Sequence, residues 1–367
     1  MRKHKFDTLQ LAHRGKTVCA YCGKRTFVNY LYSDGTPVAD GECGKCDRAD
    51  KCGVHVPPRE YFKNHQPLTS LYSPRMGKPQ RQQPKPPSYI NAKDMLNTLQ
   101  RYERNPFVRF LHSFFDEVTG SEIVDMMVER YAVGTSTKWG GATVYWQIDQ
   151  YGRIRTGKVM GYNATNGKRI HTQNNYVHSI LSERYPNFNL EQCYFGSHLI
   201  VEAEHHADLN NAERRRLNID GEFHPPIWLF ESEKAAVIVA IALMWGGAPF
   251  TFIPMATSGC GNLNPTFDAK RNPNHKIQVL KNRRVMLFPD AGKFDEWKAQ
   301  GEKLKGFCQE VYISTVMERG LHPHKVDCDI NDGDGFDDCI LQYVADGKEI
   351  WDLISACYGY QGQWKIV

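Results

Sequence analysis

Acidic residues mark three predicted strand ends, and the first two follow apolar segments that have the composition of buried strands. They are Glu231 after residues 226–230, Asp290 after residues 284–288, and Asp329 with Asp332 after Val326. In an open α/β sheet, groups at the carboxyl ends of the strands converge on one crevice. Carboxylates gathered in this way bind divalent metal ions and serve phosphoryl or nucleotidyl transfer. The sequence therefore predicts a divalent-metal site, for magnesium or manganese, at these strand ends.

Other interpretations of the acidic residues are less favourable, although two stay open. Glu231 stands where the chain leaves a buried strand. A carboxylate at such a place loses solvation, which is costly unless the group binds a partner or has a function. Glu233 and Lys234 are open to a simpler interpretation, as charges at the start of a helix. Residues 327–338 do not form a calcium loop of the EF-hand type. Such a loop needs glycine at position 6 and glutamate at position 12, and here Asp332 and Asp338 occupy those positions. A solvated acidic turn remains the alternative for that segment.

Cysteine spacing predicts a second, separate metal site. The sequence holds 11 cysteines, and five of them fall in a short N-terminal segment: Cys19, Cys22, Cys43, Cys46 and Cys52. Two C-x2-C pairs separated by a hairpin-length segment are typical of structural zinc. Cys52 and His55 form a third possible knuckle, so that six candidate ligands compete for four positions. We expect His55 to lie outside the metal shell.

Composition sets the broad class of the protein. The 367 residues, 41% of them hydrophobic, are enough for two or three domains with real cores. The net charge of +5 fits a nucleic-acid-binding protein without requiring one. We expect a cytoplasmic protein that does not contact a membrane, because no signal peptide is visible and the apolar run 235–245 is too short to span a bilayer. In that compartment the cysteines would not form a disulfide framework.

The order of segments predicts a modular chain. We expect a zinc module over residues 1–66, a linker over 67–90 that contains six prolines, and a main body from residue 91 onward. The body begins with two helices that break at Pro106. Strands over 142–148 and 154–162, a charged helix over 201–217, the strand 226–230, a wholly apolar helix over 234–245 and the strand 284–288 follow.

A basic hairpin strand is the candidate nucleic-acid surface. Arg153 and Arg155 are two residues apart, so on a strand they share a face. Lys158, Lys168 and Arg169 would extend that face as a cationic surface for a phosphate backbone or an incoming triphosphate. An ordinary solvated hairpin is the alternative interpretation.

These motifs resemble a known family. Glu231-Ser232-Glu233 and Pro289-Asp290-Ala291-Gly292 are similar to the Toprim pattern of bacterial primases, topoisomerases and phage primase-helicases. The second Asp of that pattern is displaced here, and the nearest candidate is Asp295. The run Phe195-Gly196-Ser197-His198-Leu199 resembles the segment that leads into Toprim. Residues 46–55 resemble the zinc ribbons of Toprim-containing proteins of mobile elements, a resemblance that favours Cys46 and Cys52 as ligands.

The resemblance implies a fold class of α/β and α+β parts. It places an N-terminal zinc ribbon first, then a mixed α+β primase-like subdomain over residues 91–222, and a Toprim domain with a Rossmann-like parallel sheet over residues 223–367. Glu231 would act as general acid/base, and Asp290 with Asp329 or Asp332 would hold magnesium or manganese. The zinc ribbon, Arg153 and Arg155 would engage template and nucleotide, and Lys158 and Arg169 would extend that surface.

The function implied is that of a DNA primase-like nucleotidyltransferase of a phage, plasmid or conjugative element. It would act on a single-stranded DNA template with nucleoside triphosphates, together with a separate replicative helicase, because the sequence contains no P-loop of its own. Two alternatives stay open. One is a DNA-binding accessory protein whose Toprim fold has lost its activity, which the displaced second Asp favours. The other is a Toprim nuclease, in which the same carboxylates cleave DNA.

Overall fold

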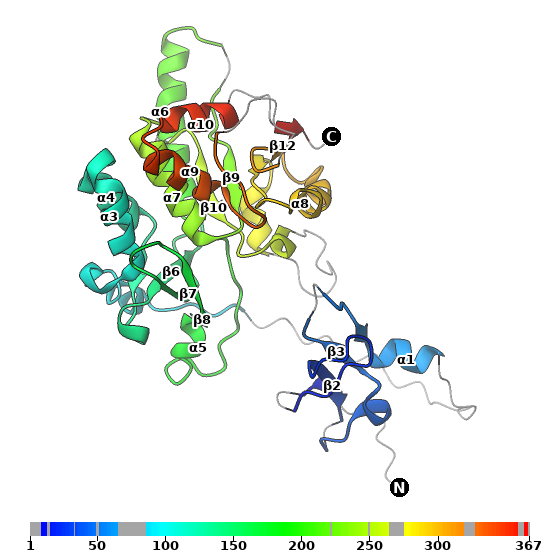
Figure 1. Ribbon diagram of the computed structural model, residues 1–367. Helices are drawn as coiled ribbons and strands as arrows, with labels where there is room; N and C mark the ends of the chain where they lie inside the picture. The colour runs from blue at the N-terminus through cyan, green and yellow to red at the C-terminus, as the bar shows by residue number, and fades with distance from the viewer. Residues whose placement is uncertain are drawn as a thin grey trace. The chain divides into compact units, whose positions relative to one another are not determined.

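The protein divides into two compact units, Met1–Gln83 and Pro84–Val367, in the computed structural model (Figure 1). The structure describes residues 9–12, 15–32, 34–48, 51–64, 86–220, 222–248, 250–263, 275–318, 327–358 and 363–365. Most of the predicted proline-rich linker, residues 67–85, lies outside the described residues. None of the helices in these ranges has the length and apolarity needed to cross a bilayer.

The first unit is a small antiparallel sheet whose strands follow one another in order. It contains β1 (Gln10–Leu11), β2 (Phe27–Leu31), the 3-10 turn η1 (Val38–Gly41), β3 (Gly44–Cys46), β4 (His55–Val56) and α1 (Pro58–Asn64). Its buried apolar side chains are few, and they gather around Cys19, Phe27 and Cys46. Such a small cluster cannot stabilise a fold of this size alone, so the unit needs a further source of stability.

The second unit begins with helices and an antiparallel sheet of order β5-β6-β7-β8. The helices are α2 (Ala92–Leu96), η2 (Tyr102–Arg104), α3 (Pro106–Thr119) and α4 (Ser121–Arg130). The strands are β5 (Val133–Thr135), β6 (Thr143–Ile148), β7 (Ile154–Tyr162) and β8 (Arg169–Tyr176), with η3 (Lys138–Gly140) before β6 and α5 (Val177–Ile180) after β8. Asn105 caps α3 with its side chain and Pro106 stands at the first turn, so the predicted break is a helix start.

The charged helix α6 (Leu199–Arg216) leads into a five-stranded sheet of order β10-β9-β11-β12-β13. Its first four strands are parallel, and β13 pairs antiparallel with β12. The elements are β9 (Ile227–Phe230), α7 (Glu233–Trp245), β10 (Ile253–Ala256), η4 (Cys260–Leu263), η5 (His275–Leu280), β11 (Arg284–Leu287), α8 (Phe294–Gly301), η6 (Glu302–Leu304), β12 (Glu310–Ser314), α9 (Phe336–Ala345), α10 (Ile350–Tyr358) and β13 (Gln363–Lys365).

The apolar helix α7 is at the centre of this core, as its sequence predicts. Ser232 begins the helix by accepting a hydrogen bond from the Ala235 backbone N–H at 3.1 Å. Every residue from Ala235 to Leu243 is buried, and the helix packs against β10, α4 and α9 (Figure 1). A helix that is apolar all round is stable only when neighbours cover all of its sides. Because the second unit combines an antiparallel sheet with a mostly parallel one, its fold class is mixed, with α/β and antiparallel parts.

One predicted element is absent from the described part of the chain. The segment 327–335 forms no strand end; it is a loop before α9. A disulfide joins Cys328 in this loop to Cys339 in α9, with Cα atoms 5.9 Å apart. The strand after β11 in the sheet is β12, and its carboxyl end carries Ser314 and Thr315 in place of an acidic residue. Five consecutive residues of glycine, asparagine and aspartate at 331–335 explain the loop, because these residues favour turns over strands.

Candidate functional sites

Glu231 and Asp290 line one pocket of about 330 Å³ at the carboxyl ends of the parallel strands. Glu231 directly follows β9, and Asp290 follows β11, the neighbouring strand. The chain passes from β9 to β10 on one side and then to β11 on the other, so the strand order reverses between β9 and β11. In open α/β sheets ligands bind at such a switch point. The two carboxylates therefore lie at the same edge of the sheet and line the same pocket, as their positions after strands predict.

The third acidic contribution comes from α9, and the predicted residues Asp329 and Asp332 are not part of the pocket lining. Asp337 and Asp338, in the first turn of α9, line the pocket in their place. Asp329 is exposed, and Asp332 lies against Gly292 on the adjoining loop. The reason is that residues 327–335 are a loop, and the helix start behind it aims its first turn at the strand ends. An acidic pair directly after a glycine-rich turn was the signal that could have found Asp337 and Asp338.

Lys234 lies among these carboxylates. Its Nζ is 2.8 Å from Asp337 Oδ2 and 3.2 Å from Asp338 Oδ1. Burial works against the charge of Lys234, but the two aspartates outweigh it and raise the pKa of this lysine. Burial raises the pKa of Asp337, and Lys234 lowers it in part. Lys234 does stand at the start of α7, and its ion pairs with two pocket carboxylates add to that simple interpretation.

The pKa of Asp290 reflects the negative charges around it. Burial raises the pKa of Asp290 to about 8, and the nearby Glu231, Asp337 and Asp338 act in the same direction. A cation bound beside Asp290 would relieve this repulsion. The oxygen donors are of the kind that magnesium and manganese prefer. In the described residues, however, no three carboxylates bring oxygen atoms within 4.8 Å of one another, so an ion would have to draw them closer.

Asp295, the nearest candidate for the second aspartate of the predicted Toprim pattern, lies away from the pocket. Asp295 is exposed in the first turn of α8 and does not line the pocket. Pocket carboxylates beyond Glu231 and Asp290 thus come from Glu233 and from the start of α9.

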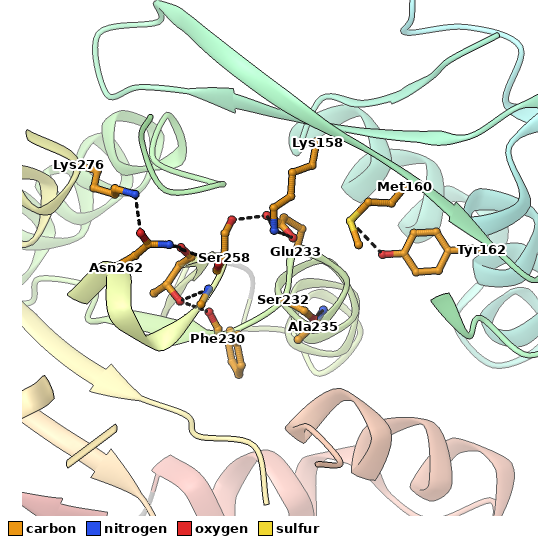
Figure 2. Close-up of polar contacts among 12 residues, drawn as sticks. Lys158, Met160, Tyr162, Phe230, Ser232, Glu233, Ala235, Ser258, Asn262 and Lys276 are labelled. Atoms are coloured by element: carbon orange, nitrogen blue, oxygen red, sulfur yellow. Dashed lines mark hydrogen bonds and ion pairs between the residues drawn. The ribbon is translucent and has the colours of Figure 1, made fainter. Parts of the chain in front are cut away.

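Lys158 and Ser258 both contact the buried carboxylate of Glu233 (Figure 2). The Lys158 Nζ, on β7 of the antiparallel sheet, lies 3.0 Å from Glu233 Oε1. The Ser258 hydroxyl donates to the same oxygen at 2.5 Å. Glu233 therefore ties the antiparallel sheet to the loop after β10, which is more than the role of a helix-start charge. Sequence reasoning missed this link, because the three residues are far apart in the chain.

The predicted basic strand divides into two parts. Arg155 is buried and ion-paired with Asp149 at 2.7 Å and Glu191 at 3.1 Å, so its proposed contact with nucleic acid is wrong. Arg153 lies just before β7 and reaches the same Asp149 oxygen at 2.9 Å. Burial alone would raise the pKa of Asp149, but the hydrogen bonds from Arg153 and Arg155 lower it. The two arginines do share a face, and that face is occupied by their carboxylate partners.

Lys158 and Arg169 line the carboxylate pocket, as a phosphate-binding surface would. Arg169 opens β8 and is exposed. Within the described ranges it forms no ion pair, whereas Lys158 is held by Glu233. The cationic surface is thus smaller than predicted, and it faces the acidic strand ends.

Four cysteines of the first unit form a cluster that could hold a metal ion. The Sγ atoms of Cys19, Cys22, Cys46 and Cys52 all lie within 4.8 Å of one another. Two of the separations are 3.7 Å, between Cys19 and Cys52, and 3.9 Å, between Cys22 and Cys46. A tetrahedral zinc with Zn–S bonds of about 2.3 Å places its sulfurs about 3.8 Å apart. The sulfur cluster therefore has the size that zinc requires.

The surroundings of the cluster favour the thiolate form at Cys22 and Cys46, whereas burial raises the pKa of Cys52 to about 12. A hydrogen bond from the Lys24 backbone lowers the pKa of Cys22 to about 6. The Thr26 hydroxyl, 3.2 Å from the Cys46 sulfur, lowers the pKa of Cys46. Since metal ligands must be deprotonated, these contacts favour binding of the ion.

Cys43 and His55 lie outside the cluster. Cys43 lies just before strand β3, and Cys46 is its last residue. Residues three apart on a strand point to opposite faces, so only Cys46 reaches the sulfur cluster. Treating Cys43 and Cys46 as a knuckle pair was therefore wrong. His55 is exposed on β4, and its Nε2 lies 2.9 Å from the Tyr30 hydroxyl. Its predicted place outside the metal shell agrees with this geometry.

Comparison with known families gives two matches. Residues 4–67 match a family described as a zinc beta-ribbon finger. Residues 105–214 match a domain of unknown function, DUF6371, which covers α3 through most of α6 and includes Lys158 and Arg169. No curated protein matches the chain. The N-terminal unit is accordingly a zinc ribbon whose four cysteines are consistent with structural zinc. Neither match is to a Toprim or primase family, so that resemblance remains a prediction.

Proposed function

We propose that this protein is a DNA primase-like nucleotidyltransferase with a Toprim-type site. It would act on single-stranded DNA with nucleoside triphosphates in the replication of a mobile element. The observation that carries the proposal is the shared pocket of Glu231 and Asp290 at the switch point of the parallel sheet. Acidic groups at that place, with cations opposite, fit the stabilisation of a transferring phosphoryl group.

Distinct roles follow for the acidic residues. Glu231 stands closest to the end of β9 and would move the proton of the attacking hydroxyl. Asp290 and Asp338 would hold magnesium or manganese, which supplies charge for the developing phosphate oxygens. Asp337 is buried and bound to Lys234, so its role is to position that lysine.

The template would be held by cations and aromatic groups. Arg169 faces the pocket without a carboxylate partner among the described residues and is free to contact a phosphate. In the ribbon, Tyr21 is 73% exposed between two zinc ligands, beside the exposed Lys24 and Arg25. Exposed aromatic rings among basic groups are typical of single-strand binding. A separate helicase would supply the unwound strand.

A second candidate, a DNA-binding accessory protein, is favoured by one observation. Lys234 already neutralises Asp337 and Asp338 in the place where a cation would bind. If that pairing persists with DNA and nucleotide bound, the pocket holds no catalytic metal.

The test is template-dependent synthesis by the full chain with single-stranded DNA, nucleotides, and magnesium or manganese. Glu231→Gln should reduce synthesis by about 100-fold to 10,000-fold while DNA affinity is kept, because a proton-transfer group is lost. Glu296→Gln, an exposed carboxylate of α8, is the matched control and should be fully active.

One outcome would overturn the role of Glu231, and two others would overturn the proposed activity. Equal synthesis by the Glu231→Gln variant would remove the assigned role. Cleavage of DNA without synthesis would make the protein a nuclease that uses the same carboxylates. DNA binding with neither activity would establish the accessory protein.

A further inference from the structure

Lys276 is a partly buried cation that has no carboxylate partner among the described residues. It belongs to η5, and its Nζ donates to Asn262 Oδ1 at 2.7 Å. No acidic side chain within the described ranges forms an ion pair with it. Burial lowers the pKa of Lys276, and the nearby Lys158 acts in the same direction. An uncompensated charge in such surroundings is costly, and an anionic ligand would remove the cost.

Asn262, the hydrogen-bond partner of Lys276, belongs to a loop that its own hydrogen bonds hold in position. Asn262 Nδ2 donates to the Thr257 carbonyl at 2.8 Å and to the Ser258 carbonyl at 3.3 Å. Asn262 therefore ties the lysine to the turn that follows β10. Gly259 in this turn has φ of 126°, a conformation that residues with side chains rarely adopt, and a Cβ at Gly261 would meet open space. The loop thus presents a small, open surface next to the lysine.

A second lysine approaches the same loop. Figure 2 shows Lys276 and Lys158 on the two sides of Ser258: Lys276 contacts Asn262 of the loop, and Lys158 contacts Glu233, which also accepts a hydrogen bond from Ser258. Lys158 is compensated by Glu233, while Lys276 is compensated by no carboxylate among the described residues. Ser258 also lines the carboxylate pocket. The site therefore has surplus positive charge directly beside the acidic strand ends.

We propose that the Ser258–Asn262 loop, with Lys276 and Lys158 at its sides, binds the triphosphate of the incoming nucleotide. This inference rests on the proposed function, since it names the substrate group that the pocket would receive. Two lysines and a glycine-containing loop recognise phosphate oxygens through charge and close backbone approach. The carboxylate pocket next to the loop would hold the metal that shares those oxygens.

The experiment measures binding of inorganic triphosphate and of ATP to the full chain by calorimetry, with magnesium and with chelator. Lys276→Met removes the charge and keeps most of the apolar stem, so the fold should be retained. We expect affinity for both probes to fall by about tenfold or more, as for the loss of a charge-assisted hydrogen bond. Lys276→Arg should keep most of the affinity. Lys281→Met, an exposed lysine just after η5, is the matched control and should bind as the unchanged protein does.

The outcomes separate this inference from the proposed function. Unchanged triphosphate affinity and unchanged KM for nucleotide in Lys276→Met would overturn the subsite, even if the protein synthesises primers. Absence of triphosphate binding by the unchanged protein under both conditions would overturn it too. Weakened binding in Lys276→Met, in a protein that makes no oligonucleotide, would support the subsite and reject the primase activity.

Discussion

The zinc ribbon and the carboxylate pocket are both metal sites predicted from residue spacing, but their geometries differ. The four ribbon sulfurs already stand at the separations that a tetrahedral ion imposes. The pocket carboxylates line one cavity without converging on a point, and Lys234 lies among them. The sulfur cluster of the first unit is consistent with structural zinc that would compensate for a small core, whereas in the second unit a large core positions carboxylates that stand apart.

The largest effect we expect is the loss of the ribbon fold when zinc is removed. Structural zinc contributes about 10–16 kcal/mol to small metal-dependent folds, far more than the few buried apolar residues of this unit can supply. Chelation should make residues 1–66 protease-sensitive while the second unit stays folded. Elemental analysis should find one zinc per chain in the unchanged protein.

A pair of cysteine variants sharpens this prediction. Cys52→Ser should lose zinc and unfold the ribbon, whereas Cys43→Ser should retain the metal, because Cys43 lies outside the cluster. Zinc retained by Cys52→Ser and lost by Cys43→Ser would reverse the ligand assignment.

A smaller effect should follow from breaking the Lys234 pair. Removing one partner of a buried ion pair costs about 3–5 kcal/mol, and the low end applies because 18% of the Lys234 side chain is exposed. Urea unfolding of Lys234→Met should show this loss, and magnesium should restore part of it by replacing the missing cation. Lys293→Met, at an exposed pair, should change stability by less than about 1 kcal/mol. Equal stability of Lys234→Met and the unchanged protein without metal would show that the pair is unimportant.

The two regions also show what a sequence can and cannot predict. Strands β9 and β11 and helix α7 were predictable because apolar runs and turn residues mark them locally, and with them the positions of Glu231 and Asp290. Asp337 and Asp338 were missed because the glycine-rich turn before them marks only the start of a helix, and the place where α9 packs is set by tertiary structure. Arg155 was misassigned for the same reason, since its partners Asp149 and Glu191 are set by tertiary packing.

The pH dependence of the metal-free protein should report on Asp290. Because burial and neighbouring carboxylates raise the pKa of Asp290 to about 8, the folded state holds its proton more tightly than the unfolded chain does. The contribution of Asp290 to the free energy of unfolding is fully present below about pH 4 and is lost as the pH rises toward 8. The loss is at most about 1.4 kcal/mol per pH unit. Asp290→Asn should flatten that part of the profile. Saturating magnesium should flatten it as well, and a profile that magnesium leaves unchanged would argue against a metal at Asp290.

The smallest effect concerns DNA affinity, and it tests how the antiparallel sheet is used. Arg169 lines the pocket and has no ion pair among the described residues, so Arg169→Ala should reduce the salt dependence of single-strand binding by about 0.7, the contribution of one phosphate contact. Arg155→Ala should leave that slope unchanged and lower thermal stability, because the buried Asp149 loses one of its two arginine partners. Arg109→Ala, an exposed arginine of α3 that does not line the pocket, serves as the control for nonspecific loss of charge. Affinity titrations over a range of salt concentrations separate the variants. A reduced slope in Arg155→Ala with no change in Arg169→Ala would place the DNA on the hairpin turn. The proposed contact between DNA and the pocket residue Arg169 would then be wrong.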